Sequence, residues 1–348
     1  GCTAFAYEEA AFAGDDLQFR SDFLAADVRD TLFAIKTLAK SEALGPRVRA
    51  LSISMTRGRS MRNALAESQC EAAQILASRL FMSEQVVSAL GDIHERWDGF
   101  GSPRQKEGDG CAIEARIVTV AHVFETAFRA GGLEYAIETI NKRLGSHIDP
   151  AIARLAIRIS STLAEQLKAS SVWFEVMQLD EFSMPVTNLT LDDVANVLGD
   201  FAALLCPMKL GHAAAVSKLA AGTAAMMGVS REMQLAIARA GRMLDLGAVC
   251  VPAQIWSKPG PLTPSESQRV RLHPHYSREI LQHASALQIE SRLVETHHER
   301  SNRSGYPKTL SGAELTVEAK ILAVAEVYAA MIAPRAYRAP LRRTSACD

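Results

Sequence analysis

The feature that most constrains this chain is an internal repeat. The stretch IHERWDGFGSPRQKEGDGCAIEARIVTVAHVF, which begins at Ile93, aligns without a gap on HHERSNRSGYPKTLSGAELTVEAKILAVAEVY, which begins at His297. The offset is 204 residues, the difference between 297 and 93. Agreement that runs through a loop and into the next periodic segment indicates two copies of one structural module. We predict a first module at residues 1–169, a linker at 170–185 and a second module at 186–348.

Both modules are predicted to be all-α. Ala, Leu, Arg, Glu and Met dominate, and apolar residues recur three and four positions apart. Thr263-Pro264-Ser265-Glu266 has the pattern of a helix start, with a capping hydroxyl, a proline at the first helical position and a glutamate that completes a capping box. The segment from Ser230 to Gly247 places an apolar stripe on one face and predicts a core helix that ends near the glycine.

Composition excludes several classes of protein. Hydrophobic residues make up 48% of the 348-residue chain, and 38 basic residues against 39 acidic ones leave a formal charge of −1. That balance argues against nucleic-acid binding through a broad basic surface. No apolar run reaches the roughly 18 residues that a membrane span needs. The six cysteines form no Cys-x-x-Cys pair and follow no secretory signal. We therefore expect a cytoplasmic protein that binds neither membranes nor nucleic acid.

Most of the side chains that could carry chemistry lie in the second module. Six of the nine histidines follow residue 200. His212 opens a predicted core helix, Asp245 lies at the end of the next one, and Glu326 lies inside the apolar helix predicted for 317–332. Imidazoles and carboxylates at the inner ends of several helices form a ligand set for a divalent metal. Histidines held in the core by hydrogen bonds would give the same pattern, so spacing alone leaves both interpretations open.

Three segments of the second module resemble a known family. They are KPGPLTPSESQRVRLHPHYSREIL, HHERSNRSGYP and EAKILAVAEVYAAMIAPRAYRAPL. Together they are similar to the HD-GYP branch of the HD-domain metal-dependent phosphohydrolases, which takes its name from the tripeptide found here at 305–307. The resemblance implies an all-α fold, two or three iron or manganese ions, and hydrolysis of cyclic di-GMP.

The resemblance also assigns roles to individual residues. Asp245 would bridge two metal ions, and Asp245 and His298 would be catalytic. Arg335, Arg338 and Tyr306 are predicted to face the substrate phosphates, and the Gly-Tyr-Pro loop to contact signalling partners. The metal ligands that the resemblance implies are His212, Asp245, His273, His297, His298 and Glu326.

The second module departs from the family pattern at several positions. Leu244 stands where the family has the histidine of its HD motif, and Ala248 where a lysine is usual. Met208 stands where trinuclear members carry a ligand glutamate, and Glu326 where an aspartate is expected. The first module departs further: Gln69, Ile93 and His122 occupy the places of His273, His297 and Glu326. We expect the first module to be structural and to bind no catalytic metal.

Two functions remain open at this stage. One is a divergent metal-dependent phosphodiesterase that acts on a cyclic dinucleotide or another nucleotide phosphoester. The other is a catalytically silent HD-GYP-like module with a regulatory or interaction role in a bacterial signalling protein. The retained ligand set favours the enzyme, with manganese or iron as cofactor, whereas the loss at Leu244 favours the silent module.

Overall fold

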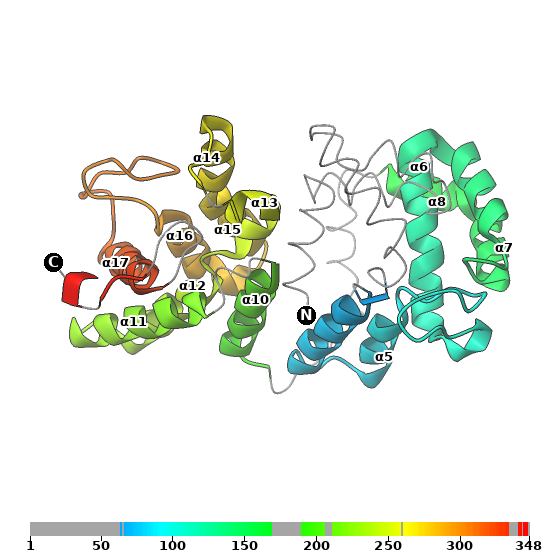
Figure 1. Ribbon diagram of the computed structural model, residues 1–348, viewed down its shortest axis with the longest axis horizontal. Coiled ribbons are helices and arrows are strands. Elements are labelled where there is room, and N and C mark those ends of the chain that lie inside the picture. Colours follow the sequence, from blue (N-terminus) through cyan, green and yellow to red (C-terminus); the bar gives the residue numbers. More distant parts are fainter. Residues whose placement is uncertain are drawn as a thin grey trace. The chain divides into compact units, whose positions relative to one another are not determined.

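The computed structural model describes residues 63–64, 66–168, 189–205, 211–258, 260–333, 340–342 and 344–346. These residues are helical and contain no β-strand, only isolated β-bridges, which confirms the all-α prediction. The chain divides into two compact units, and among the described residues the boundary falls between Leu189 and Thr190 (Figure 1). The predicted linker at 170–185 lies outside the described residues.

The first unit is built around one long helix, α6. Its two halves meet at Gly132, whose φ of 78° is the left-handed conformation that glycine adopts readily. A core of apolar side chains from both halves of α6 and from α7 includes Phe124 and Ile140. The helices with assigned bounds in this unit are α5 (Glu84–Asp92), η1 (Gly108–Gly110), α6 (Ile113–Arg143), α7 (Pro150–Arg158) and α8 (Ser160–Leu167).

The second unit places three helices around its core: α11, α12 and α17. Val216, Ile237 and Leu322 are fully buried there. The bounds of its helices are α10 (Leu191–Leu205), α11 (His212–Met226), α12 (Arg231–Met243), η4 (Leu246–Cys250), α13 (Ala253–Trp256), α14 (Pro264–Arg271), α15 (His273–Leu281), η5 (Ser285–Leu287), α16 (Gln288–Thr296), α17 (Val317–Ile332) and η6 (Thr344–Ala346) (Figure 1).

The helix starts follow the sequence signals. Thr263 and Glu266 form the predicted capping box at α14, with Pro264 at its first position. The hydroxyl of Ser230 accepts a hydrogen bond from a backbone N–H in the first turn of α12. The end of α12 differs from the prediction, because the helix stops at Met243 and a 3₁₀ turn carries Gly247. A Cβ at Gly247 would overlap the carbonyl oxygen of His273, so the glycine serves a close approach of α15 rather than a helix end.

The repeat is visible in the backbone. Helix α6 begins at Ile113 and α17 at Val317, again 204 residues apart. The isolated bridge between Asp98 and Glu107 has its counterpart between Asn302 and Ser311 at the same offset. The positive φ angles in these loops also correspond, with Gln105 at 55° and Thr309 at 57°. The loop before each of these helices is therefore one structure used twice.

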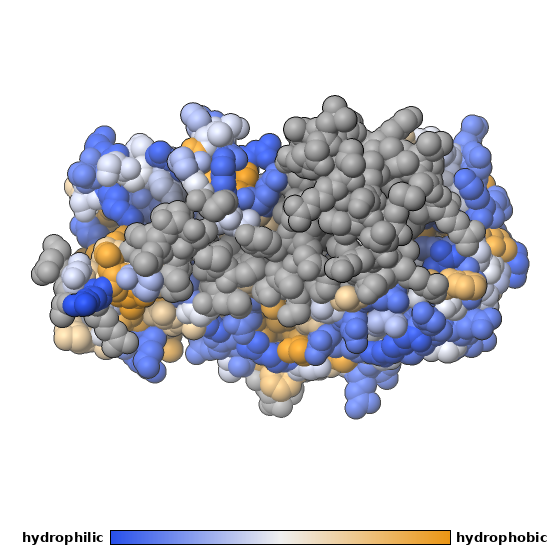
Figure 2. Space-filling view, viewed as in Figure 1, coloured by the Kyte–Doolittle hydropathy of each residue, from blue (hydrophilic) through white to orange (hydrophobic). Residues whose placement is uncertain are grey.

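The surface gives no sign of a membrane-spanning element. Figure 2 shows mostly hydrophilic residues on the visible face of the described parts, with apolar residues in small patches. Among the helices of the described residues, none combines the length and hydropathy that crossing a bilayer requires.

Candidate metal centre

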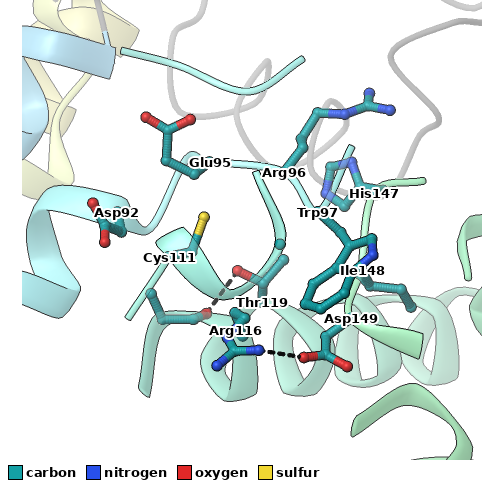
Figure 3. Close-up of a pocket in the computed structure, with 12 residues that line it drawn as sticks. Asp92, Glu95, Arg96, Trp97, Cys111, Arg116, Thr119, His147, Ile148 and Asp149 are labelled. Carbon is teal, nitrogen blue, oxygen red and sulfur yellow. Dashed lines mark hydrogen bonds and ion pairs between the residues drawn. The ribbon is translucent and has the colours of Figure 1, made fainter. Parts of the chain in front are cut away.

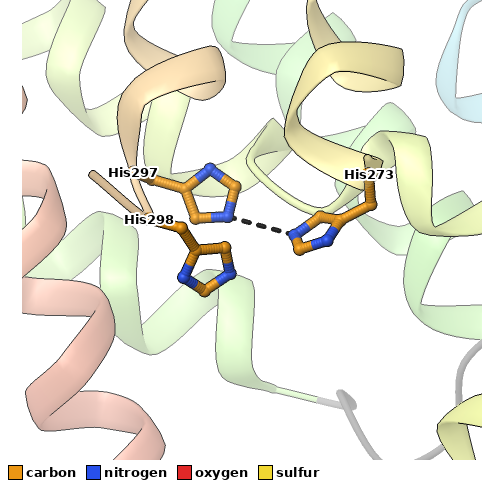
Figure 4. Close-up of side chains that lie close together, drawn as sticks. All are labelled: His273, His297 and His298. Atoms are coloured by element: carbon orange, nitrogen blue, oxygen red, sulfur yellow. Dashed lines mark hydrogen bonds between the residues drawn. The ribbon is translucent and has the colours of Figure 1, made fainter. Parts of the chain in front are cut away.

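The centre of the second unit contains two buried histidines whose rings meet edge to edge. His273 is the first residue of α15, and His297 follows the last residue of α16. Their Nε2 atoms lie 3.2 Å apart (Figure 4). In each ring the Nδ1 atom lies 2.6 Å from a backbone carbonyl oxygen, that of Val270 for His273 and that of Val294 for His297. Helix ends thus fix both rings.

These contacts favour one tautomer of each ring. A backbone carbonyl only accepts, so each Nδ1 is the donor in its contact. Two neutral rings in this tautomer would present Nε2 lone pairs to each other, an arrangement that either a shared proton or a bound metal satisfies. Backbone-oriented imidazoles with Nε2 exposed to one point are the usual arrangement of histidine metal ligands. The residues present therefore fit a divalent metal.

A third histidine completes this group. The ring of His298 packs against both of the others, with its centroid 4.2 Å from that of His297 and 5.0 Å from that of His273. Nitrogen atoms of the three rings lie within 4.8 Å of one another, close enough to share an ion, and among the described residues this is the group that meets that criterion. The ring of Tyr306 stacks on His298 at 4.7 Å, so the tyrosine of the Gly-Tyr-Pro loop covers the outer side of the cluster.

Two carboxylates lie next to the histidines. Asp245 Oδ1 is 3.4 Å from His273 Nε2. Glu326, on α17, places Oε1 3.8 Å from His212 Nε2 and Oε2 3.8 Å from His298 Nδ1. All these carboxylate and imidazole groups are buried or nearly so. Burying so many ionisable groups in one place is costly unless a cation or a hydrogen-bond network compensates them.

Asp245 is positioned by a residue that the sequence analysis did not single out. Ser277 is fully buried on α15, donates its hydroxyl to the carbonyl of Leu244 at 2.8 Å and accepts from the N–H of Gly247 at 2.8 Å. These two hydrogen bonds hold the turn that contains Asp245 against α15, the helix that begins with His273. The sequence signal was weak, because serines in helices are common and its partners lie about 30 residues away.

The structure brings together all six side chains for which metal ligation was expected. It places Tyr306 against them, whereas Arg335, Arg338 and Met208 lie outside the described residues. Leu244, at the position of the missing histidine, packs into the hydrophobic core. Two further histidines lie outside this cluster: His283 is exposed, and His275 is half-buried, 3.8 Å from the carboxylate of Glu295.

Another missed residue, Glu299, holds the Gly-Tyr-Pro loop in shape. Its carboxylate is 1% exposed and accepts three backbone hydrogen bonds, from Lys308, Thr309 and Leu310, at 2.6, 3.1 and 2.9 Å. In the first unit Glu95 accepts equivalent bonds from Arg104 and Lys106. The identity of Glu95 and Glu299 in the aligned copies was the available signal.

The corresponding position of the first unit holds a glutamine next to a histidine. Gln69, the counterpart of His273, places its carbonyl oxygen 3.1 Å from Nε2 of His94, the counterpart of His298. Burial, together with the nearby His122, lowers the pKa of His94. A neutral imidazole that donates to an amide oxygen satisfies both groups without an ion.

The fold and this cluster define a class, the metal-dependent hydrolase fold built on the HD domain. The model of the family described as "HD domain" matches residues 49–152 and 196–348, which is most of the chain and includes both units. The chain belongs to this family, and its likeness to the HD-GYP branch of phosphohydrolases is thereby confirmed.

Several proteins of known activity resemble the chain. The 3'3'-cGAMP-specific phosphodiesterase 3 of Vibrio cholerae is 25% identical over 95% of this chain and 73% of its own length. The cyclic di-GMP phosphodiesterase response regulator RpfG of Xanthomonas campestris is 27% identical over 62% of this chain, which spans 55% of that protein. A crystal structure of a cyclic GMP-AMP-specific phosphodiesterase from V. cholerae (V-cGAP3) superposes with a TM-score of 0.62 at 23% identity, covering 95% of this chain and 79% of the other, and supports the fold.

Proposed function

We propose that the second unit is a metal-dependent phosphodiesterase that cleaves a cyclic dinucleotide. The observation that carries this proposal is the pair of facing Nε2 atoms of His273 and His297, flanked by the carboxylates of Asp245 and Glu326. The similarity to enzymes named for 3'3'-cGAMP and cyclic di-GMP hydrolysis supplies the substrate class.

The six clustered residues are the proposed metal ligands. By the observed distances, Asp245 groups with His273 and His297, and Glu326 groups with His212 and His298. A mixed imidazole and carboxylate set suits manganese or iron. A bound divalent metal would supply a water ligand whose pKa is near 7, a nucleophile suited to attack at phosphorus.

The remaining roles belong to side chains around the cluster. Burial and the nearby carboxylates of Glu326 and Asp245 raise the pKa of Tyr306, so its phenol stays protonated and donates to a phosphate oxygen. His298, which stacks against Tyr306 and is partly exposed, is also proposed to be catalytic, because the metal that it would hold lies beside the substrate. Arg335 and Arg338 remain proposed contacts of the substrate phosphates.

The organisation of the chain completes the proposal. We assign residues 1–169 to a structural module and 186–348 to the module with the metal centre. The Gly-Tyr-Pro loop is the proposed contact for signalling proteins in the cytoplasm, and we expect no nucleic-acid partner.

The activity is tested with 3'3'-cGAMP and cyclic di-GMP as separate substrates, in the presence of Mn²⁺ or Fe²⁺ and with products separated by chromatography. The proposal predicts linear dinucleotide with wild-type protein and none with His297→Ala. His94→Ala, in the first unit, is the matched control and retains full activity. Absence of product from wild-type protein loaded with metal would contradict the proposal.

One observation favours the second candidate, a silent regulatory module. Leu244 is 1% exposed and packs in the hydrophobic core, so an apolar side chain stands where the family has a metal ligand. Tight binding of a cyclic dinucleotide without hydrolysis would support that candidate.

A further inference from the structure

One arginine of the repeat has different partners in the two copies. In the first unit Arg96 forms a two-pronged ion pair with Asp98, with Nε 2.9 Å from Oδ1 and Nη2 2.6 Å from Oδ2. Both side chains are less than 20% exposed. Arg96 lines a pocket that also contains the ion pair between Arg116 and Asp149 (Figure 3). Its guanidinium is thus committed to the carboxylate two residues along its own loop.

The equivalent loop of the second unit differs at the residue that pairs with the arginine, where an amide replaces the carboxylate. Asn302 stands in the place of Asp98. Its side-chain oxygen accepts a hydrogen bond from the N–H of Ser304 at 3.1 Å, just as Asp98 accepts one from Phe100 at 3.2 Å. The turn is therefore preserved, while the negative charge that would hold the arginine is lost.

Arg300, the counterpart of Arg96, takes another direction. Its Nη1 donates to the carbonyl oxygen of Glu299 at 2.8 Å, and its Nη2 lies 4.0 Å from Oε2 of Glu326. This is the same carboxylate oxygen that lies 3.8 Å from His298. The arginine of the second unit therefore points to the metal centre, whereas the arginine of the first unit points to its own loop.

The location suits a phosphate contact. The side chain of Arg300 is 36% exposed, so the guanidinium lies between the buried cluster and solvent. A guanidinium offers five N–H donors in a planar fork that matches two phosphate oxygens.

We propose that Arg300 binds a phosphate of the substrate, and that the neutral Asn302 is what makes it available. The proposal rests on the function proposed above. It adds a phosphate-binding residue to that site and explains why the two copies differ at position 302.

The decisive variant is Asn302→Asp, which restores the carboxylate without changing the size of the side chain. The new carboxylate is expected to draw Arg300 into the loop, as Asp98 does with Arg96. KM for the cyclic dinucleotide then rises by about tenfold, the effect of one lost charged hydrogen bond, while kcat stays within about twofold. Arg300→Met gives the same loss, and Arg300→Lys restores part of it.

The matched control is Asp98→Asn in the first unit. This variant replaces the carboxylate by an amide at the equivalent loop position, and we expect it to leave KM unchanged. Metal content, measured by mass spectrometry, stays at the wild-type level in Asn302→Asp, which separates a substrate contact from a disturbed metal centre.

Binding is measured in parallel by calorimetry with a phosphorothioate analogue of cyclic di-GMP and Mn²⁺. About tenfold weaker binding to Asn302→Asp and Arg300→Met supports the role of Arg300, whether or not wild-type protein hydrolyses the substrate. Absence of turnover by wild-type protein that still binds would overturn only the proposed function. Unchanged affinity in both variants overturns the role of Arg300 and leaves the proposed function standing. A wild-type protein that neither binds nor hydrolyses overturns both.

Discussion

The Nε2 atoms of His273 and His297 face each other at 3.2 Å, and each ring donates its other nitrogen's proton to a carbonyl of the preceding helical turn. The helix ends therefore hold the two Nε2 atoms close to one point. Asp245, clamped by Ser277, adds a carboxylate 3.4 Å away. Such preorganisation favours metal binding, because little ordering remains to be done when the ion arrives.

The buried carboxylate of Glu299 should be essential to the Gly-Tyr-Pro loop. Glu299→Ala leaves three backbone N–H groups without their acceptor and is expected to lower the free energy of unfolding by about 2–4 kcal/mol. Urea denaturation followed by circular dichroism measures this. Glu279→Ala, at an exposed position on α15, is the control and changes stability by less than about 0.5 kcal/mol. Equal stability of the two variants would contradict the role given to Glu299.

Restoring a histidine at position 244 tests the missing ligand. Leu244→His removes a fully packed apolar side chain, so without metal we expect a loss of about 2–4 kcal/mol in stability. With Mn²⁺ the variant should regain part of that loss and bind more metal than wild type. Melting temperatures with and without Mn²⁺ measure the difference. A variant that gains no more from Mn²⁺ than wild type would count against a metal at this position.

Much of the fold followed from the sequence because its signals are local. The capping box at Thr263 and the start of α17 one repeat after α6 depend on neighbouring residues and on an ungapped alignment. The gathering of the histidines and carboxylates of the second module in one place was implied by the resemblance to the HD-GYP family, which rests on short motifs.

The supporting residues could not be found in this way. Ser277 and Glu299 act on backbone groups that reach them only after the loops have folded. Arg300 points in a different direction from Arg96 because Asn302 lacks the charge of Asp98. The effect of this substitution is recognised only by comparison with the ion pair of Arg96 and Asp98 in the first unit. Local propensity carries no information about such contacts.

The capping box at α14 predicts a pH dependence. A hydrogen bond from Lys258 and the backbone N–H of Thr263 lower the pKa of Glu266 to about 2. Because the folded-state pKa lies below the unfolded value of about 4.3, the ionised carboxylate stabilises the fold above about pH 4.3. This contribution is lost as the pH falls through 2.

Glu266→Gln measures that contribution. The melting temperature of wild type should exceed that of the variant near pH 6, and the gap should close as the pH approaches 2. Because the pair is only partly buried, added salt should narrow the gap as well. A gap that is independent of pH would show that the charge of Glu266 contributes nothing.

The first unit is expected to hold no catalytic metal. Gln69 already occupies the place of a ligand and bonds to His94. His94→Ala and His122→Ala should therefore leave the metal content of the whole chain unchanged, as measured by inductively coupled plasma mass spectrometry. Loss of one metal equivalent in either variant would place a metal in the first unit.

The metal content of wild type and Asp245→Ala, both purified without chelator, tests the metal centre itself. We expect at least one equivalent of manganese, iron or zinc in wild type and its loss in Asp245→Ala, with the helical circular dichroism signal retained. Wild-type protein without stoichiometric metal, or an Asp245→Ala variant that keeps it, would contradict a metal centre built on these residues.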